Sequence, residues 1–104
     1  MEITTQQSCQ TVLCTFEVTP GTADDVMEML QDAYAEVISK QPGFLSASLH
    51  MNDAHTRIAN YSQWEGRDDY KAMLRTDEMR ARNRDIHGLC KSFEPVMYEV
   101  KGVY

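Results

Sequence analysis

Hydrophobic and polar residues alternate along residues 11–18, and this two-residue period predicts a β-strand with one apolar side. The apolar side carries Val12, Cys14, Phe16 and Val18. In this pattern Cys14 is interpreted as a small core residue rather than as a nucleophile. Pro20 and Gly21 end the strand, because proline and glycine interrupt regular structure.

After Gly21 the period becomes that of an α-helix, and the predicted helix runs to about Lys40. Its apolar stripe consists of Val26, Met29, Leu30, Ala33 and Val37. Thr22 and Asp25 resemble a capping box, in which two side chains satisfy free backbone N–H groups. Asp24 and Asp25 also suit the positive end of the helix dipole.

Two strands are predicted next, over residues 44–51 and 57–65, and the polar segment 52–56 between them predicts a hairpin. A second helical region follows over residues 66–90. Thr76 and Asp77 are expected to interrupt this region and to start a new helical segment after it.

The last predicted strand covers residues 94–103, with Pro95 near its start, where proline is tolerated. The element order is therefore β-α-β-β-α-β. This order predicts an α+β, ferredoxin-like fold, with a four-stranded antiparallel sheet and the helices on one face. Residues 1–9 are polar and are predicted to be a flexible tail, and residues 10–104 form a single domain.

Both faces of this sheet are expected to carry apolar residues. In the second strand Leu45, Ala47, Leu49 and Met51 alternate with Phe44, Ser46, Ser48 and His50. Because the helices cover only one face, the other face needs a second cover. A homodimer that packs sheet against sheet is the simplest arrangement that supplies one.

Composition narrows the function classes. The net charge of −6 and the pI near 4.9 argue against nucleic acid and against an anionic membrane surface, since both require clustered basic residues. No apolar run is long enough for a transmembrane helix, and the first residues do not resemble a signal peptide. Cys9, Cys14 and Cys90 form no CxxC motif, which favours reduced thiols in the cytoplasm. No His/Cys/carboxylate cluster has metal-ligand spacing.

The third strand carries the first candidate site. Ile58, Asn60, Ser62 and Trp64 occupy alternate positions. They therefore share one face of the sheet. An amide, a hydroxyl and an indole are expensive to bury without partners, and a pocket for a flat molecule with polar edges would supply those partners. In the alternative interpretation, Trp64 is a core anchor and Asn60 satisfies a backbone group.

The second helical region carries a cationic stripe, since Arg80, Arg84 and His87 share one helix face. If this face is exposed, the stripe is solvated. If the face points at the sheet, Arg84 becomes a fixed cation that stabilises a phenolate or enolate near Asn60 and Trp64.

His50 lies near the end of the second strand, and its neighbours depend on the hairpin register, which the sequence leaves open. A register with an even index sum places His50 and Asn60 on one face, where the imidazole would act as a base. Otherwise His50 is an exposed or hydrogen-bonded histidine. His55 and His87 have weaker claims to a site.

Several of these segments together resemble a known family. The resemblance rests on residues 42–47 (Pro-Gly-Phe-Leu-Ser-Ala), on His50, on residues 60–65 (Asn-Tyr-Ser-Gln-Trp-Glu) and on Tyr70. This pattern resembles the antibiotic biosynthesis monooxygenase family over about residues 10–101. The likeness is greatest to the cofactor-independent enzymes of aromatic polyketide pathways.

The resemblance implies a homodimeric α+β barrel, in which two ferredoxin-like sheets pack face to face. It also implies an enzyme, a monooxygenase that oxidises a small aromatic phenol, anthrone or quinol to a quinone with O₂. Such an enzyme uses no flavin, haem or metal, because the deprotonated substrate itself reduces oxygen.

The same resemblance implies roles for five residues. Trp64 and Asn60 would orient the substrate and hold a developing oxyanion or peroxide. Tyr70 would donate or relay a proton. Arg84 would stabilise the anion, and His50 would be the base.

Other members of this superfamily suggest alternatives. A haem-degrading branch places its iron-ligating histidine where this chain has Leu74, and it uses an asparagine on the first strand, which residues 11–18 lack. His87 is a displaced substitute for that histidine. A small signal-molecule isomerase and a non-catalytic small-molecule-binding dimer are the remaining alternatives.

Overall fold

The computed structural model describes residues 9–104, so most of the predicted tail 1–9 lies outside the described residues. The elements are β1 (Gln10–Glu17), α1 (Ala23–Glu36), η1 (Ile38–Lys40), β2 (Phe44–Met51), β3 (Arg57–Trp64), α2 (Arg67–Arg75), α3 (Asp77–Gly88) and β4 (Ser92–Tyr98). The predicted order of strands and helical regions is confirmed. No helix in this part of the chain is long and apolar enough to cross a membrane.

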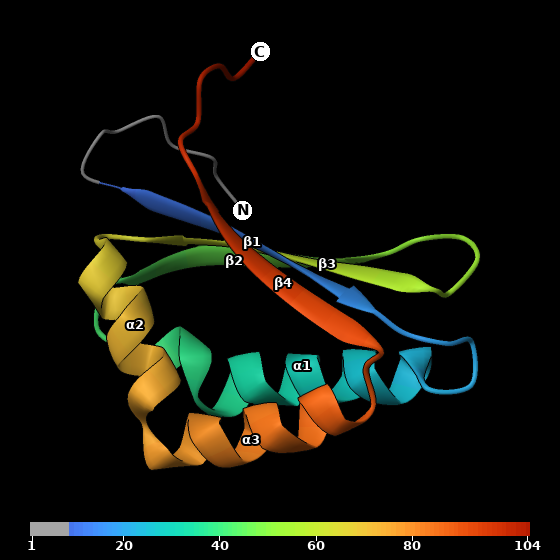
Figure 1. Ribbon diagram of the computed structural model, residues 1–104. Coiled ribbons are helices and arrows are strands. Elements are labelled where there is room, and N and C mark those ends of the chain that lie inside the picture. Colours follow the sequence, from blue (N-terminus) through green and yellow to red (C-terminus); the bar gives the residue numbers. More distant parts are fainter. Residues whose placement is uncertain (1–8) are drawn as a thin grey trace.

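The four strands form one antiparallel sheet in the order β2-β3-β1-β4. All helices lie on one face of it, below the sheet in Figure 1. The opposite face carries Leu13, which pairs with Tyr61 of β3 and Val96 of β4. The predicted α+β ferredoxin-like fold with two apolar sheet faces is therefore confirmed.

The core between sheet and helices is divided into two clusters. One surrounds Trp64 and includes Val12, Tyr70 and Met79. The other surrounds Ile58 and includes Phe16, Val26, Leu30 and Ile86. The helix-facing residues of β1 and β3 thus pack at both ends of the sheet, and a cavity lies between the sheet and the helices.

Helix termini differ from the predictions at the start of α1. Thr22 precedes the helix, but its side chain forms no capping hydrogen bond. Its Oγ1 instead lies 3.2 Å from Oγ1 of Thr19. The predicted capping box is therefore wrong, because a local hydroxyl pair takes the place of the N–H contact. The helix also ends at Glu36, and a short 3₁₀ turn continues to Lys40.

The break inside the second helical region is confirmed. Oγ1 of Thr76 accepts a hydrogen bond from the backbone N–H of Met79 at 3.2 Å, so Thr76 caps the start of α3. The last strand was predicted too late in the chain. β4 begins at Ser92 and ends at Tyr98, and it pairs with β1 over this whole length.

A bulge between Phe44 and Ser46 corrects the simple alternation predicted for β2. Phe44 pairs with Trp64, and Ala47 pairs with Ser62, so both face the helices. Gly43 precedes the bulge with φ of +83°, and a Cβ there would lie 2.3 Å from a side-chain carbon of Asp69. Only glycine fits this turn, which fixes the start of β2.

Candidate functional site

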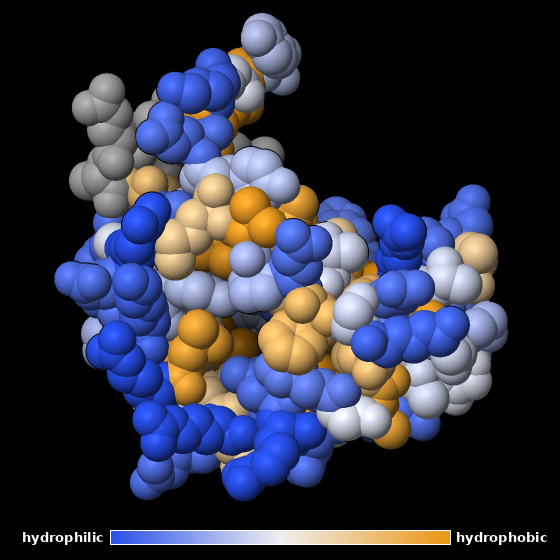
Figure 2. All heavy atoms as spheres, in the orientation of Figure 1, coloured by the Kyte–Doolittle hydropathy of each residue, from blue (hydrophilic) through white to orange (hydrophobic). Residues whose placement is uncertain are grey.

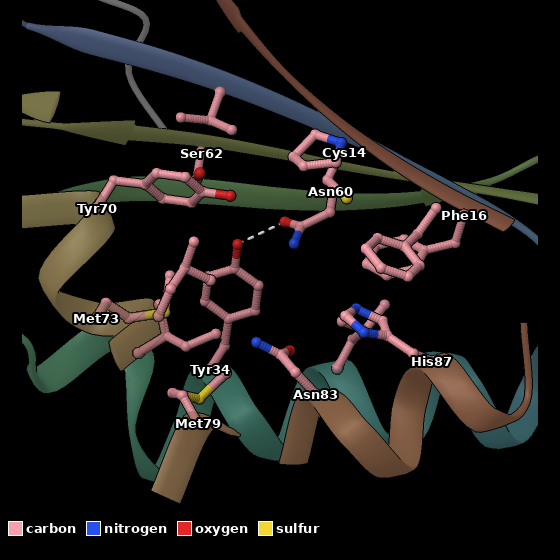
Figure 3. A pocket seen from close by; sticks show the side chains of 16 residues that line it. Cys14, Phe16, Tyr34, Asn60, Ser62, Tyr70, Met73, Met79, Asn83 and His87 are labelled. Carbon is pink, nitrogen blue, oxygen red and sulfur yellow. Dashed lines mark hydrogen bonds between the residues drawn. The ribbon is translucent and has the colours of Figure 1, made fainter. Parts of the chain in front are cut away.

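A partly open cavity of about 150 Å³ lies between the sheet and the helices. In Figure 2 a hollow with a hydrophobic floor is visible between these two layers. Most of the lining is apolar, and the polar groups come from a strand wall and a helix wall, shown in Figure 3. The polar lining residues are Cys14, Tyr34, Asn60, Ser62, Tyr70, Asn83 and His87.

The strand wall is formed mainly by β3. Asn60 and Ser62 are alternate residues on its helix-facing side, as predicted, and both line the cavity. The hydroxyl of Tyr34 donates a hydrogen bond to Oδ1 of Asn60 at 2.5 Å (Figure 3). Within residues 9–104 the amide N–H groups of Asn60 donate no hydrogen bond, so they are available to a ligand.

Trp64 is fully buried next to the cavity, but it does not line it. Its indole N–H donates to Oγ of Ser62 at 3.1 Å. The ring packs edge-on against Phe44 and Tyr70, with centroid distances of 5.4 and 5.9 Å. Trp64 thus fixes the positions of two cavity residues, Ser62 and Tyr70.

Tyr70 directs its hydroxyl into the cavity (Figure 3). This hydroxyl forms no hydrogen bond with another residue of the described chain, 9–104. Burial raises the pKa of Tyr70 to about 12, so the phenol stays protonated at neutral pH and can donate a proton or hydrogen bond. Burial also raises the pKa of Tyr34.

The helix wall is formed by α3. Asn83 and His87 are one helical turn apart, and both line the cavity (Figure 3). Within residues 9–104, neither side chain forms a hydrogen bond. The His87 ring stacks on Phe93 of β4 at a centroid distance of 3.5 Å. Burial lowers the pKa of His87, so the ring is neutral near pH 7 and can accept a proton.

Arg84 lies outside the cavity and is exposed on α3. The predicted stripe of Arg80, Arg84 and His87 is therefore split, since only His87 reaches the cavity. The phase of the helix explains this. Successive residues of an α-helix are about 100° apart around its axis. The buried Ile86 marks the inner face of α3, and Asn83 and His87 lie close to that face, whereas Arg84 lies away from it.

His50 lies on the sheet face opposite the helices. It pairs with Ala59, whereas Asn60 pairs with Leu49, so the register has an odd index sum. The register that would place His50 beside Asn60 is therefore not the one observed, and the two side chains point to opposite faces of the sheet. Its Nε2 lies 2.9 Å from Oγ of Ser48 on the same strand. Asn60, Tyr70 and Trp64 thus lie together, while Arg84 and His50 lie elsewhere.

Two cavity residues escaped the sequence analysis, Tyr34 and Asn83. Asn83 lies four residues after the buried Met79 and three before the buried Ile86, which places it on the inner face of α3. Tyr34 borders the apolar stripe of α1, next to Ala33. Both residues could be found from the sequence by including the polar positions that flank the apolar stripes of α1 and α3 among the candidates.

Cys14 lines the cavity as a protonated thiol. Burial raises its pKa to about 12, which agrees with a core residue and not with a nucleophile. Leu74, at the position of the haem-branch histidine, also lines the cavity. In the part of the chain that the structure describes, no group of three or more His, Cys, Asp or Glu residues is arranged to hold a metal ion.

Comparison with known proteins identifies the family. The family model described as "Antibiotic biosynthesis monooxygenase" matches residues 10–84, which include β1, β2, β3 and most of the cavity lining. The chain belongs to this family.

A curated relative, tetracenomycin-F1 monooxygenase of Streptomyces glaucescens, is 30% identical over 63 residues. The match spans 61% of this chain and 56% of the length of that relative. It therefore covers little more than half of the relative, and the relative's activity is transferred only as a proposal.

Two solved structures are similar along most of the chain. A monooxygenase from the gene ActVA-Orf6 of Streptomyces coelicolor, in complex with nanaomycin D, has a TM-score of 0.77 and 28% identity. The match covers 91% of this chain and 89% of that one. SnoaB, a cofactor-independent oxygenase from Streptomyces nogalater, has a TM-score of 0.81 and 16% identity, with 92% and 96% of the two chains covered. The SnoaB likeness supports the fold alone.

Proposed function

We propose that this protein is a cofactor-independent monooxygenase that oxidises an aromatic phenol, anthrone or quinol to a quinone with O₂. The observation that carries the proposal is the apolar cavity, into which an unpaired phenol, two amides and a neutral imidazole project. A site for an aromatic ring with one reacting oxygen requires this combination of apolar walls and few polar groups. The family and the named monooxygenases among the relatives support the reaction class.

The chemistry needs one base and donors that stabilise an anion. Removal of a proton gives a phenolate or enolate, which transfers an electron to O₂. The two radicals combine through a new C–O bond, which gives a carbon-bound peroxide. Cleavage of the O–O bond and loss of the C–H proton from the same carbon leave a C=O group and release water. A phenol or anthrone with a C–H group at the reacting carbon supplies all four electrons. A quinol supplies only two, and O₂ is then released as H₂O₂.

His87 is the base in this scheme, because it is the histidine that lines the cavity and burial keeps it neutral. The amide N–H groups of Asn60 and Asn83 stabilise the anion. Tyr70 protonates the peroxide and recovers its proton from the C–H group, while the His87 imidazolium proton neutralises the departing hydroxide. The lowered pKa of His87 leaves the ring unprotonated at neutral pH, and the raised pKa of Tyr70 keeps the phenol protonated, which are the starting states that these two roles need.

Trp64 supports the site from behind, through Ser62 and Tyr70. The roles predicted for Arg84 and His50 stay predictions, and their distance from the cavity lining favours Asn83 and His87 in their places.

We also propose that the protein is a homodimer joined through the open face of the sheet. This face carries Leu13, Tyr61 and Val96, and Val96 is 37% exposed. Apolar sheet faces of this kind need a cover, and a second copy supplies one. Light scattering of the wild type and of Leu13→Asp measures the mass, and a monomeric wild type would contradict the dimer.

Oxygen uptake with anthrone or dihydroxynaphthalene tests the activity, with protein freed of metal and flavin. We expect uptake with formation of the quinone by the wild type and a loss of about 100-fold or more in Tyr70→Phe, as for other acid–base groups. The matched control is Tyr104→Phe, a change at an exposed tyrosine outside the cavity. Binding without oxygen uptake would favour the non-catalytic binding dimer, and a haem titration would then test the haem-degrading alternative.

A further inference from the structure

Tyr34 separates the cavity from a second hollow. An open groove of about 670 Å³ runs between α1 and the edge strand β2. Of the residues that the structure describes, only Tyr34 lines both the cavity and this groove. The Tyr34 side chain is therefore the partition between them.

The Tyr34 side chain is held by a hydrogen bond and by packing against the core cluster around Trp64. The hydroxyl donates one hydrogen bond to Asn60, and the ring packs against Phe44 at a centroid distance of 6.0 Å. Figure 3 shows the ring extending from α1 toward β3, with the hydroxyl directed at Asn60. Because Phe44 also lines the groove, the ring contact lies on the groove side. A ligand hydroxyl that donates to Oδ1 of Asn60 would replace the hydrogen bond from Tyr34.

The cavity alone is too small for a ligand with several fused rings, so the position of Tyr34 limits the size of the ligand. A cavity of about 150 Å³ accepts a single benzene ring. Sites for larger ligands have volumes of ~300 Å³ or more. A fused polycyclic aromatic therefore does not fit while Tyr34 is bonded to Asn60, but it fits when the cavity and the groove are joined.

We propose that Tyr34 is a movable partition that determines the size of the ligand. In its Asn60-bonded position the site takes one aromatic ring. When Tyr34 turns away, a fused-ring ligand places its first ring in the cavity and its outer rings in the groove. A hydroxyl of the ligand then takes the place of the tyrosine hydroxyl as the donor to Oδ1 of Asn60. The ligand class, an aromatic phenol, rests on the proposed function.

The groove lining suits the outer rings of such a ligand. Phe44, Ala47 and Leu49 provide apolar surface. Polar groups come from both sides of the groove, from Gln31 and Ser39 on the helix side and from Ser46 and Ser48 of β2. Flat apolar rings with oxygen substituents at their edges match this distribution. The structure thus assigns the groove as the subsite for the outer rings.

Calorimetric titration with two inert probes tests the proposal, because binding is then measured without turnover. The single-ring probe is 4-methylphenol, and the three-ring probe is 1,8-dihydroxyanthraquinone. Tyr34→Phe keeps the ring but loses the bond to Asn60. We expect this variant to bind the three-ring probe about three- to tenfold more tightly, the equivalent of one neutral hydrogen bond, and the single-ring probe within about twofold of the wild type.

A second variant tests the groove without altering the cavity. Ala35 is exposed and lines the groove only. Ala35→Leu should weaken binding of the three-ring probe about tenfold and leave the single-ring probe unchanged. Tyr104→Phe changes an exposed tyrosine that lines neither the cavity nor the groove, so it is the matched control and should change neither affinity.

Equal effects on both probes, or an unchanged affinity for the three-ring probe in both Tyr34→Phe and Ala35→Leu, would overturn the partition. The proposed function fails separately. Size selectivity that follows Tyr34, without oxygen uptake by the wild type, contradicts the oxygenase and leaves the partition intact. Oxygen uptake without the selectivity contradicts the partition alone.

Discussion

The strand wall and the helix wall of the cavity hold their polar groups in different ways. On β3, the side chains of Asn60 and Ser62 each form a hydrogen bond inside the protein, to Tyr34 and Trp64. On α3, the side chains of Asn83 and His87 form none with any residue from 9 to 104, and His87 is held by stacking on Phe93. One wall is fixed before a ligand arrives, and the other keeps its hydrogen-bonding capacity for the ligand.

This difference separates stability from binding within one small site. Buried groups that are bonded and packed, such as Trp64, contribute mainly to folding. Cavity groups without protein partners contribute little to folding and are available for a ligand or a reacting atom. Substitutions on the strand wall should therefore mainly lower the free energy of unfolding, whereas substitutions on the helix wall should mainly weaken ligand binding or activity.

The largest expected effect is on the strand wall. Trp64→Ala removes a fully buried indole that packs on Phe44 and Tyr70. It should lower the free energy of unfolding by about 3–5 kcal/mol, because the loss of a large core side chain leaves a cavity. Urea denaturation followed by circular dichroism measures this loss. Asn83→Ala is the control on the helix wall and should change stability by about 0.5 kcal/mol or less.

A loss below about 1 kcal/mol in Trp64→Ala would contradict the division between the walls. Trp64 would then behave as a pocket residue and not as a core anchor. Such a result would return Trp64 to the direct role in substrate orientation that the family resemblance implies.

A smaller effect is expected from two neighbouring residues of α3. Asn83→Ala should weaken binding of 4-methylphenol about three- to tenfold, because one neutral hydrogen bond to the ligand is lost. Arg84→Ala should change the affinity by less than about twofold, since Arg84 is exposed outside the cavity. Calorimetric titration measures both. A larger loss in Arg84→Ala than in Asn83→Ala would restore Arg84 as the anion-binding residue.

The strand wall could be predicted well from the sequence. The two-residue period places Asn60, Ser62 and Trp64 on one face whatever the neighbouring strands do, and the structure confirms this arrangement. The same period does not reveal which strand-face residues line a cavity and which pack fully. Trp64 shares a face with Asn60, yet aromatic neighbours from β2 and α2 enclose it.

The helix wall and His50 were harder to predict, for two different reasons. A polar helix such as α3 has few apolar residues to show which of its faces points toward the sheet. A rotation of about 100° about the helix axis is enough to bring Arg84 to the place of Asn83. The position of His50 depends on the pairing register, and a bulge near Phe44 alters the pairing at the start of β2. The groove that Tyr34 borders depends on how α1 packs beside β2, which no local pattern encodes.

The smallest expected effect, and the sharpest test of the helix wall, is the pH dependence of His87. Burial lowers its folded-state pKa below the ordinary value of 6.5. Between these two values the unfolded chain binds the additional proton, so the free energy of unfolding falls as the pH drops below about 6.5. The neutral base is also lost as the pH falls through the folded-state pKa, so kcat/KM for oxygen uptake should decline there.

His87→Gln should remove both dependences, since glutamine keeps a polar side chain but does not titrate. Because it also removes the base, it should lower kcat/KM about 100-fold or more at all pH values. Oxygen uptake at low substrate concentration and urea denaturation, each measured from about pH 5 to pH 8, detect them. His55→Gln, in the hairpin turn outside the cavity, is the matched control and should keep the acidic limb of the wild type. If the decline of kcat/KM at low pH persists in His87→Gln, the base is another group, and the helix wall then serves binding alone.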